Sequence, residues 1–566
     1  MSTLSGLVKR GSEAYATIQT RAVPKDCLFL VLAAFVSFVF YLPGLGFYSD
    51  DWNFLSLLHL SDGQSPPELY QGLYAGDVVI RQRPFQMVYL VLFYWLFGLD
   101  PFFYHFANAV ALTANGILLY LVLREFRQDR LNALAISFVY LLLPHYSTDR
   151  FWIAAHQATF SISFYLLSLY ADLRALRAYP EHWMRWKLLS FAGLILSGLS
   201  YEVALPLFVL SPLLVWFGSP HASQNGLDVS SKRIKFTSLF AANLLALLLI
   251  VGFKALVTVR TNVETDLVTH LIYLVTGALR VNFATYGAGL PYIVSWILFH
   301  EPNWILVAVS VLLGLFTFRY LYGINEQPEH QWSGKKNGWL LTLFGLLVFG
   351  LGYVIFAFNS DLWFTSTSLG NRTAIAAAIG VAITFIGLAA WLSSLLPERW
   401  TRIAFCLSVA LLGSSGFLIV NTLASFWLTA YQGQQEVLNK MRENVPALPA
   451  GSTLILDGVC LEHGGAYLFT GKRDLASALW IAYRDPSLRA TVLASSPDVG
   501  EQGLSIFTYR SKDFYPYGKD LLIYNAAHEK LYPLTNADRA QQYFESSGFV
   551  PEQECPPGFA WGWNDQ

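Results

Sequence analysis

The chain has 566 residues, of which 54% are hydrophobic, 16% are aromatic and only 13% are charged. A soluble globular protein usually carries about 25% charged residues, and apolar runs of about 18 or more residues recur over most of this chain. The composition excludes a single soluble domain and a disordered chain. It predicts a polytopic α-helical membrane protein.

The charge balance excludes a nucleic-acid partner. Lys and Arg together number 37 and Asp and Glu 38, which gives a formal net charge of −1. No basic stripe is present that could neutralise the phosphates of DNA or RNA.

The N-terminal segment, residues 1–26, is predicted to be cytoplasmic because basic residues gather before the first apolar run. That run, at about 27–47, is too long for a cleaved signal peptide and is expected to stay as an anchor. Counting crossings between basic clusters gives about eleven transmembrane helices and places the C-terminal region outside. These predicted helices are 27–47, 103–123, 131–147, 157–176, 188–200, 203–218, 237–258, 302–322, 338–358, 373–396 and 403–424.

Two further apolar segments are predicted to lie on the outer face of the membrane. Residues 84–98 are short for a crossing, and a crossing there would place the next basic cluster outside. Residues 266–300 are expected to form two short amphipathic pieces around Gly287 and Gly289.

The composition changes from about residue 431, where charged residues, Gly and Pro become frequent. The chain is therefore predicted to divide into a transmembrane domain at 27–430 and an extracytoplasmic α/β domain at 431–566. Expected strands are 453–456, 504–509 and 521–524, and expected helices are 431–444, 473–483 and 536–546.

The four cysteines are too few for a disulfide scaffold. Cys27 and Cys406 lie in apolar spans and are expected to be core residues. Cys460 and Cys555 could form one disulfide if the C-terminal region lies outside the cytoplasm.

The first predicted outer loop opens with two adjacent acids, Asp50 and Asp51, directly after the first span. One interpretation is structural, with Ser49 or Asp50 capping a helix over 51–60. The other is that one carboxylate accepts the proton of an attacking hydroxyl while its neighbour positions it. The same pair could also hold a divalent ion such as Mg²⁺ or Mn²⁺, although few further ligands are evident and no metal is required.

Basic residues close the same loop. Arg81 and Arg83 could clamp an anionic lipid headgroup, or simply reach the phosphates of surrounding membrane lipids. The other outer loops hold further polar candidates: Asp149, Arg150 and His156 in the second, Glu202 in the third, and Asp361 with Arg372 in the fourth.

These residues occur in an order that resembles a known family. The matching motifs are Arg83-Pro84, Gly98 to Pro101, Tyr104-His105 with Asn108, Pro144 with Trp152-Ile153, Ser200 to Pro206 around Glu202, and Asn371-Arg372 leading to Gly380. The run is similar to that of the GT-C class of membrane glycosyltransferases. It most resembles the membrane half of the tetratricopeptide-bearing protein O-mannosyltransferases, although the tetratricopeptide repeats are absent.

The resemblance implies a GT-C-like fold and transfer of a sugar from a polyprenyl-phosphate donor to an acceptor hydroxyl on the outer face of the membrane. The acceptor would be a protein, a lipid or a glycan. The implied catalytic base is Asp50 with Asp51 beside it, and the implied groups at the donor phosphate are Arg83 and Arg372, with Arg81 and His156 near them. The supporting residues that it implies are His105, Asn108, Asp149, Arg150 and Glu202. We expect direct displacement at the anomeric carbon of the sugar, with inversion. We also expect the protein to lie in the inner membrane of a bacterium.

Three other interpretations remain open: a flippase or permease for a lipid-linked precursor, a polymerase or ligase of lipid-linked glycans, and a non-catalytic assembly factor. Transporters tend to show inverted repeats, and none is evident here. A polymerase would be expected to use a large central outer loop, whereas the paired acids lie in the first.

Overall fold

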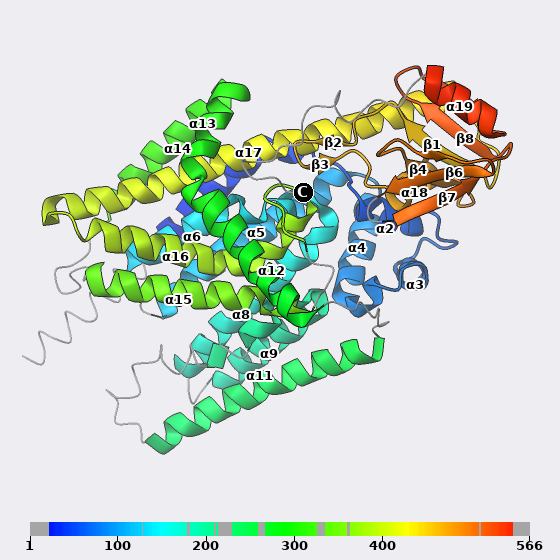
Figure 1. The fold of residues 1–566 in the computed structure, drawn as a ribbon. Coiled ribbons are helices and arrows are strands. Elements are labelled where there is room, and N and C mark those ends of the chain that lie inside the picture. The colour runs from blue at the N-terminus through cyan, green and yellow to red at the C-terminus, as the bar shows by residue number, and fades with distance from the viewer. Residues whose placement is uncertain are drawn as a thin grey trace, which may run out of the picture.

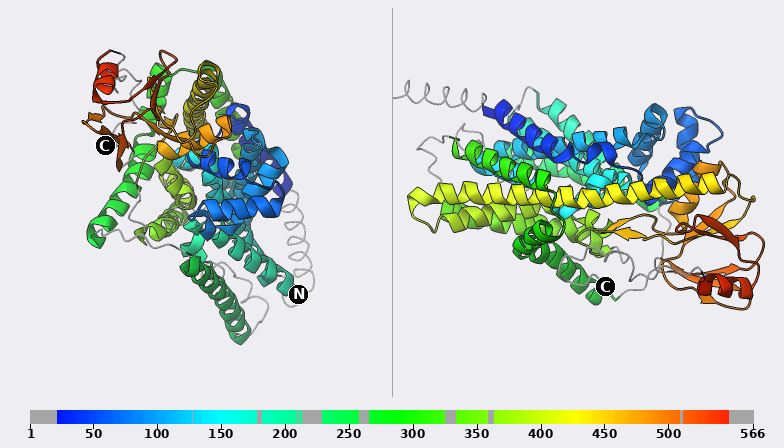
Figure 2. Two further views of the ribbon diagram at one scale, coloured as in Figure 1. Left: turned by 90° about the vertical axis from the view of Figure 1, so that its right-hand side faces the viewer. Right: turned by 90° about the horizontal axis from the view of Figure 1, so that it is seen from above.

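The structure is a computed structural model that describes residues 22–126, 128–177, 182–208, 211–212, 229–257, 266–324, 334–358, 363–508 and 511–546. A bundle of long helices forms one end of the molecule and a small domain of strands and helices forms the other (Figures 1 and 2). The predicted polytopic helical architecture with a C-terminal strand-containing domain is confirmed.

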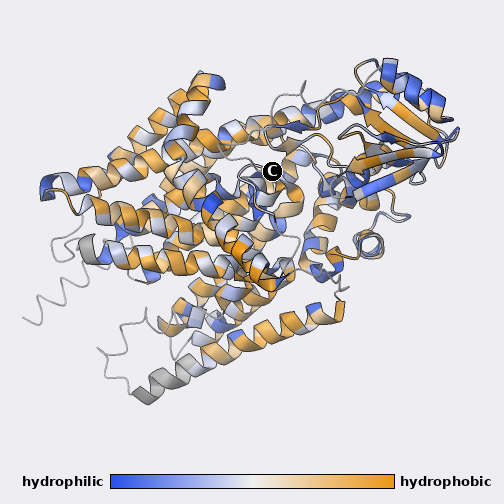
Figure 3. Cartoon of the chain, viewed as in Figure 1, coloured by the Kyte–Doolittle hydropathy of each residue, from blue (hydrophilic) through white to orange (hydrophobic). Residues whose placement is uncertain are grey.

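Within the described residues, seven helices are long and apolar enough to cross a membrane, and they make this a multi-pass membrane protein. Figure 3 shows the long apolar runs along these helices and the more polar C-terminal domain. The seven are α5 (Pro101–Glu125), α11 (Val229–Val257), α12 with the π-helical η7 (Leu267–Ala288), α14 (Trp304–Tyr322), α15 (Gly334–Val354), α16 with its preceding turn (Leu369–Ser393) and α17 (Glu398–Asn444).

Other predicted spans also form helices, but these do not meet the same limits of length and composition. They are residues 22–38, α6 (Arg130–Leu142), α8 (His156–Arg177) and α9 (Trp183–Ser200). Every residue of α6 after the first is buried, so this 13-residue helix is enclosed by its neighbours. Half of the predicted span 203–218 lies outside the described residues.

One segment differs from the sequence-based expectation. Residues 266–300 were expected as two surface pieces, but α12 (Leu267–Leu279) continues without a break into η7 (Arg280–Ala288) and reaches the length of a span. Within this run the Asn282 side chain donates to the Ala278 carbonyl and to the Tyr353 hydroxyl, at 2.8 Å each, and so ties the helix to its neighbour. In the remainder of this segment, α13 (Leu290–His300) is a short apolar helix. The other predicted surface segment also forms a short apolar helix, α4 (Pro84–Phe97).

The first of the four loops predicted to lie outside, which keep the name outer loops here, folds into a cap of short helices at the end of the bundle that faces the C-terminal domain (Figure 1). It contains α2 (Asp50–His59), α3 (Pro66–Gly76), the turn η2 (Ile80–Gln82) and α4. The second outer loop packs beside it as three short turns: η3 (Pro144–Tyr146), α7 (Thr148–Phe151) and η4 (Ile153–Ala155). The third contributes η5 (Glu202–Ala204), and the fourth contributes η10 (Leu369–Ala374), which leads into α16 (Ile375–Ser393).

The C-terminal domain is built on a four-stranded sheet of order β4-β1-β8-β9. The central strand β1 (Thr453–Asp457) is parallel to β4 (Arg489–Val492) and β8 (Leu521–Asn525), and β9 (Lys530–Pro533) is antiparallel to β8. Helix α18 (Lys472–Tyr483) precedes β4, and α19 (Ala537–Ser546) ends the described chain. An antiparallel sheet joins β5 (Asp498–Val499), β6 (Gly503–Thr508) and β7 (Ser511–Pro516), while β2 (Glu462–His463) pairs with β3 (Ala466–Tyr467).

Helix α17 connects the two parts. It runs unbroken for 47 residues from the bundle to the C-terminal domain, across the predicted domain boundary at 430/431 (Figure 2). Cys27 and Cys406 are free, and Cys460 is disulfide-bonded. Its predicted partner, Cys555, lies outside the described residues.

Candidate active site

A cavity of about 230 Å³ lies where the outer loops meet the C-terminal domain. Asp50, Arg83 and Arg372 all line it, although Arg372 lies more than 280 residues after Arg83 in the sequence. The cavity therefore brings together one predicted base and two predicted phosphate-binding arginines.

Asp50 is the first residue of α2, and its side chain lines the cavity. Burial raises the pKa of this carboxyl above its usual value, and the nearby charges of Arg372, Arg473 and Arg83 oppose that rise. A carboxylate with a raised pKa is a stronger base than a solvated one. The preceding Ser49 has a positive φ of 48° and makes no side-chain cap, so the capping interpretation does not hold for Ser49.

Asp51 lies in a different environment, although it is the adjacent residue. It is only 1% exposed, and its carboxylate accepts from the backbone N–H groups of Ala154 at 2.7 Å, Tyr48 at 3.0 Å and Ile153 at 3.4 Å. Asp51 thus joins the first outer loop to the second. The predicted pair divides into one cavity-lining carboxylate and one carboxylate that holds two loops together.

Arg83 is positioned by Glu202 of the third loop. The Glu202 carboxylate lies 3.7 Å from Arg83 Nε and 2.5 Å from Lys254 Nζ, and Lys254 also donates to the Gln82 carbonyl at 2.9 Å. Burial acts to raise the pKa of Glu202, but the charges of Arg83 and Lys254 outweigh it and lower that pKa. The guanidinium also stacks over the Tyr201 ring, with 4.6 Å from Cζ to the centroid.

Replacing Glu202 by alanine should therefore destabilise the protein and misplace Arg83. Removing one partner from a largely buried ion pair costs about 3 kcal/mol or more, because it leaves the partner charges without compensation. Thermal unfolding in lipid nanodiscs should show a lower midpoint for Glu202→Ala. The matched control is Asp498→Ala, which breaks a surface pair with Lys512 and should cost less than about 1 kcal/mol. Equal midpoints for the two variants would contradict the positioning role.

Arg372 is held by the second loop. Its guanidinium packs over the Trp152 ring at 4.7 Å, and the indole of Trp152 donates to the Tyr48 carbonyl at 2.9 Å. The neighbouring Asn371 accepts from Ser147 Oγ at 3.1 Å and from the Thr148 N–H at 3.2 Å. The fourth loop is thus tied to the second, which fixes Arg372 at the cavity.

Arg81 does not line this cavity. It donates to the carbonyls of Tyr74 at 2.6 Å and Ala75 at 3.2 Å, and it stacks over the Tyr74 ring at 4.8 Å. The structure therefore places Arg81 as a link within the first loop.

The predicted supporting residues lie behind the cavity and connect the loops to the bundle. His105 contacts the Gly46 carbonyl at 2.8 Å, and its ring lies 5.5 Å from that of the buried His156. Asn108 donates to the Asp149 carbonyl at 2.7 Å. The Asp149 side chain is fully buried, and Arg150 donates to the Leu141 carbonyl inside the bundle. Asp361 lies outside the described residues.

Sequence reasoning missed two charged residues of the cavity, Asp77 and Arg473. Asp77 is 4% exposed and accepts from the N–H groups of Val79 at 2.8 Å and Ile80 at 3.1 Å and from Asn53 Nδ2 at 3.1 Å. Arg473 Nη1 lies 3.8 Å from Asp77 Oδ2. No local motif marks either residue, because they come from the middle of a long loop and from the C-terminal domain.

The described ranges contain no group of three or more His, Cys, Asp or Glu side chains placed to hold a metal ion. Both oxygens of Asp51 accept backbone N–H groups, whereas Asp50 lines the cavity, so the two carboxylates lie in different surroundings.

No protein family and no curated protein matches this sequence. Among solved structures, ArnT from Cupriavidus metallidurans bound to undecaprenyl phosphate is similar at 14% identity and a TM-score of 0.37, over 81% of this chain and 84% of that one. The Archaeoglobus fulgidus oligosaccharyltransferase in complex with Zn and sulfate is similar at 15% identity and a TM-score of 0.37, over 76% of this chain and 60% of that one. The same archaeal enzyme tethered to an acceptor peptide is similar at 13% identity, a TM-score of 0.37 and 76% and 61% coverage.

Proposed function

We propose that this protein transfers a sugar from a polyprenyl-phosphate-linked donor to an acceptor hydroxyl at the membrane surface. The observation that carries the proposal is the cavity, which is lined by one carboxylate of raised pKa and three guanidiniums. Carboxylates accept protons from attacking hydroxyls, and guanidiniums bind phosphate through their planar forks. The sequence resemblance to GT-C glycosyltransferases points to the same reaction.

In the proposed reaction the acceptor oxygen attacks the anomeric carbon and forms the new C–O bond with inversion. The bond from that carbon to the phosphate oxygen breaks, and the polyprenyl phosphate leaves with the electron pair. Asp50 receives the acceptor proton. Arg83 and Arg372 stabilise the negative charge that grows on the leaving phosphate, in a cavity where fixed cations act more strongly than in water.

The proposal places the cavity on the outer face of a bacterial inner membrane, with the N-terminus in the cytoplasm. The disulfide at Cys460 supports this orientation for the C-terminal domain, since disulfides persist in oxidising compartments. A hexosyl group such as mannose, and a protein, lipid or glycan acceptor, belong to the same proposal through the sequence resemblance.

The test uses the full-length protein in lipid nanodiscs with a panel of polyprenyl-phosphate sugars carrying a radiolabel in the sugar, and with membrane extract as the source of acceptors. We expect consumption of one donor with transfer of the label. Absence of turnover of every donor, together with lipid movement across the bilayer in a flipping assay, would overturn the proposal in favour of transport.

The proposal also predicts the pH dependence. Only ionised Asp50 can accept a proton, so the rate should fall as the pH falls through its raised pKa, above the usual carboxyl value of about 4. Replacing Arg372 by glutamine removes a positive charge that opposes this rise and should move the acid limb of kcat/KM to higher pH. Profiles of wild type and Arg372→Gln check this. A limb that stays in place or moves to lower pH would contradict Asp50 as the titrating base.

A further inference from the structure

We infer that the C-terminal domain completes the cavity and that its Arg473 binds the donor phosphate. This inference rests on the proposed transfer reaction and assigns a role to a residue outside the transmembrane region. It makes the C-terminal domain part of the reaction site in addition to any part it has in recognising the acceptor.

The position of Arg473 supports this role. It is the second residue of α18 and lines the same cavity as Asp50, Arg83 and Arg372. Its guanidinium lies 3.8 Å from Asp77, which is close enough for charge attraction but longer than a hydrogen bond. Three hydrogen bonds fix the Asp77 carboxylate, and its charge attracts the Arg473 guanidinium. The Arg473 side chain is 61% exposed, so its guanidinium N–H groups are available to a ligand.

The segment that carries Arg473 is fixed against the first outer loop. Asp474 accepts from Thr470 N at 2.5 Å, from Thr470 Oγ1 at 2.8 Å and from Gly471 N at 3.0 Å, which orders the start of α18. Thr470 Oγ1 in turn lies 3.4 Å from the hydroxyl of Ser49, the residue before Asp50. The residue before α18's N-terminal turn therefore contacts the residue that precedes the proposed base, Asp50.

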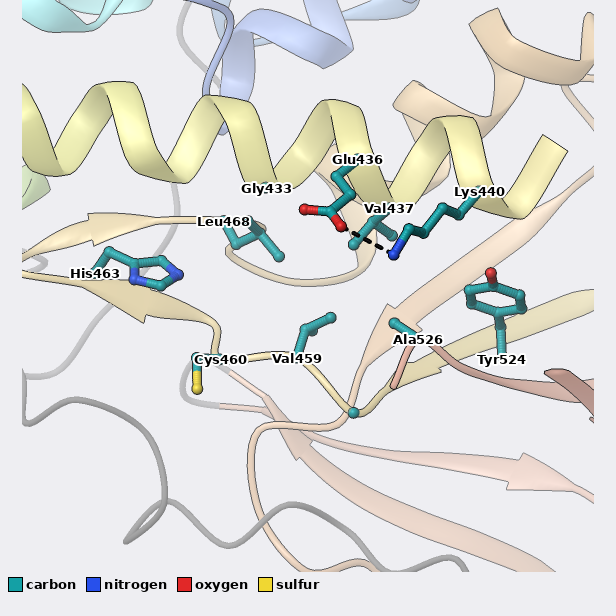
Figure 4. A pocket seen from close by; sticks show the side chains of 11 residues that line it. Gly433, Glu436, Val437, Lys440, Val459, Cys460, His463, Leu468, Tyr524 and Ala526 are labelled. Atoms are coloured by element: carbon teal, nitrogen blue, oxygen red, sulfur yellow. Dashed lines mark ion pairs between the residues drawn. The ribbon is translucent and has the colours of Figure 1, made fainter. Parts of the chain in front are cut away.

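Helix α17 holds the same domain from the other side. Gln434 accepts from the Trp52 indole at 3.3 Å and donates to the Leu468 carbonyl at 2.5 Å, so one side chain joins α2, α17 and the C-terminal domain. Further along α17, Lys440 pairs with Glu436 and Glu529 at 2.9 Å each. Figure 4 shows the Glu436–Lys440 pair beside a second cavity, with Val459 and Tyr524 of the domain opposite α17. These contacts fix the domain that carries Arg473 against α17 and α2.

The charges of the cavity explain why a third arginine is useful. The charged residues that line the cavity are Arg83, Arg372 and Arg473 with Asp50 and Asp77, and behind Arg83 the charges of Glu202 and Lys254 cancel each other. These three arginines and two carboxylates leave one excess positive charge, which matches the single charge of a phosphodiester donor. The phosphate gains a second negative charge as the sugar departs, so the cations interact more strongly with the transition state than with the bound donor. Arg473 should consequently affect kcat more than the donor KM.

The experiment compares Arg473→Ala with the adjacent Lys472→Ala in full-length protein in nanodiscs. Lys472 occupies the same turn of α18 but pairs with Asp513 at 3.1 Å and does not line the cavity. We expect Arg473→Ala to lower kcat by about tenfold to a hundredfold, with a smaller change in donor KM. We also expect it to weaken the binding of undecaprenyl phosphate by about tenfold, and Arg473→Lys to restore part of both. Lys472→Ala should match wild type.

Three results would overturn the inference. Arg473→Ala could retain wild-type kcat and wild-type affinity for undecaprenyl phosphate, it could change only the KM of the acceptor, or Lys472→Ala could lose as much as Arg473→Ala. The measurement of undecaprenyl phosphate binding tests this inference separately from the proposed function. If wild type turned over no donor, the transferase proposal would fail, whereas dependence of undecaprenyl phosphate binding on Arg473 would still decide the residue's role.

Discussion

Replacing Asp50 by asparagine should lower the rate of sugar transfer by about a hundredfold to ten-thousandfold, the usual contribution of a positioned general base. Asparagine keeps the size and polarity of the side chain but cannot accept the hydroxyl proton. Asp50 lines the cavity, so this change should leave the packing of the first loop intact. Single-turnover rates measured with a radiolabelled donor check the loss, and undecaprenyl phosphate binding should stay within a few-fold of wild type.

The control for this prediction is Asp62→Asn, the same substitution at an exposed acid of the same loop. It should transfer sugar at the wild-type rate. If Asp50→Asn were as active as Asp62→Asn, Asp50 would not be the base, and the catalytic assignment would be wrong.

Replacing Asp51 by alanine should have the largest effect on stability. Three backbone N–H groups of two loops would lose their acceptor, and an unsatisfied buried polar group costs about 1–3 kcal/mol. We expect a loss of about 3 kcal/mol or more in the free energy of unfolding, seen as a lower midpoint of thermal unfolding in nanodiscs. Transfer should fall as well, because Trp152 would no longer hold Arg372 in place.

Asp51→Asn provides a graded comparison, since one amide oxygen can still accept part of these hydrogen bonds. Its midpoint should lie between those of wild type and Asp51→Ala. A variant Asp51→Ala that unfolds at the wild-type temperature yet transfers no sugar would show that Asp51 acts chemically and would contradict the structural role assigned to it.

Long apolar runs and short runs of β-favouring residues were sufficient to predict many elements closely. The predicted helix 103–123 is α5 (Pro101–Glu125), 302–322 is α14 (Trp304–Tyr322), and the strand 521–524 is β8 (Leu521–Asn525). Hydrophobic burial acts on each of these segments directly, so their local pattern carries the information.

The prediction failed where one segment depends on another. The glycines in 266–300 suggested a break, but Asn282 bonds to Tyr353 of α15 and the helix continues as η7. The predicted helices 403–424 and 431–444 both form, but α17 joins them into one helix through the change in composition near 430. The composition of a helix depends on whether lipid or water surrounds it. Where a helix ends depends instead on a breaker or a capping residue, so a change in composition does not mark its end.

For the candidate site, the charged residues of the predicted outer loops together with the sequence resemblance pointed to Asp50, Arg83 and Arg372, which the structure brings to one cavity. It did not separate the roles of Asp50 and Asp51, because adjacent residues of a helix point in different directions and only the packed loops decide which one faces the cavity.

The sequence by itself determined that this is a polytopic helical membrane protein with a small C-terminal domain, since apolar length and composition are properties of each segment alone. Only the tertiary structure decided that Asp77 and Arg473 belong to the same cavity as Asp50. They are nearly 400 residues apart in the chain, and the physical reason for their meeting is the docking of α18 and α17 against the first loop, which no local pattern records.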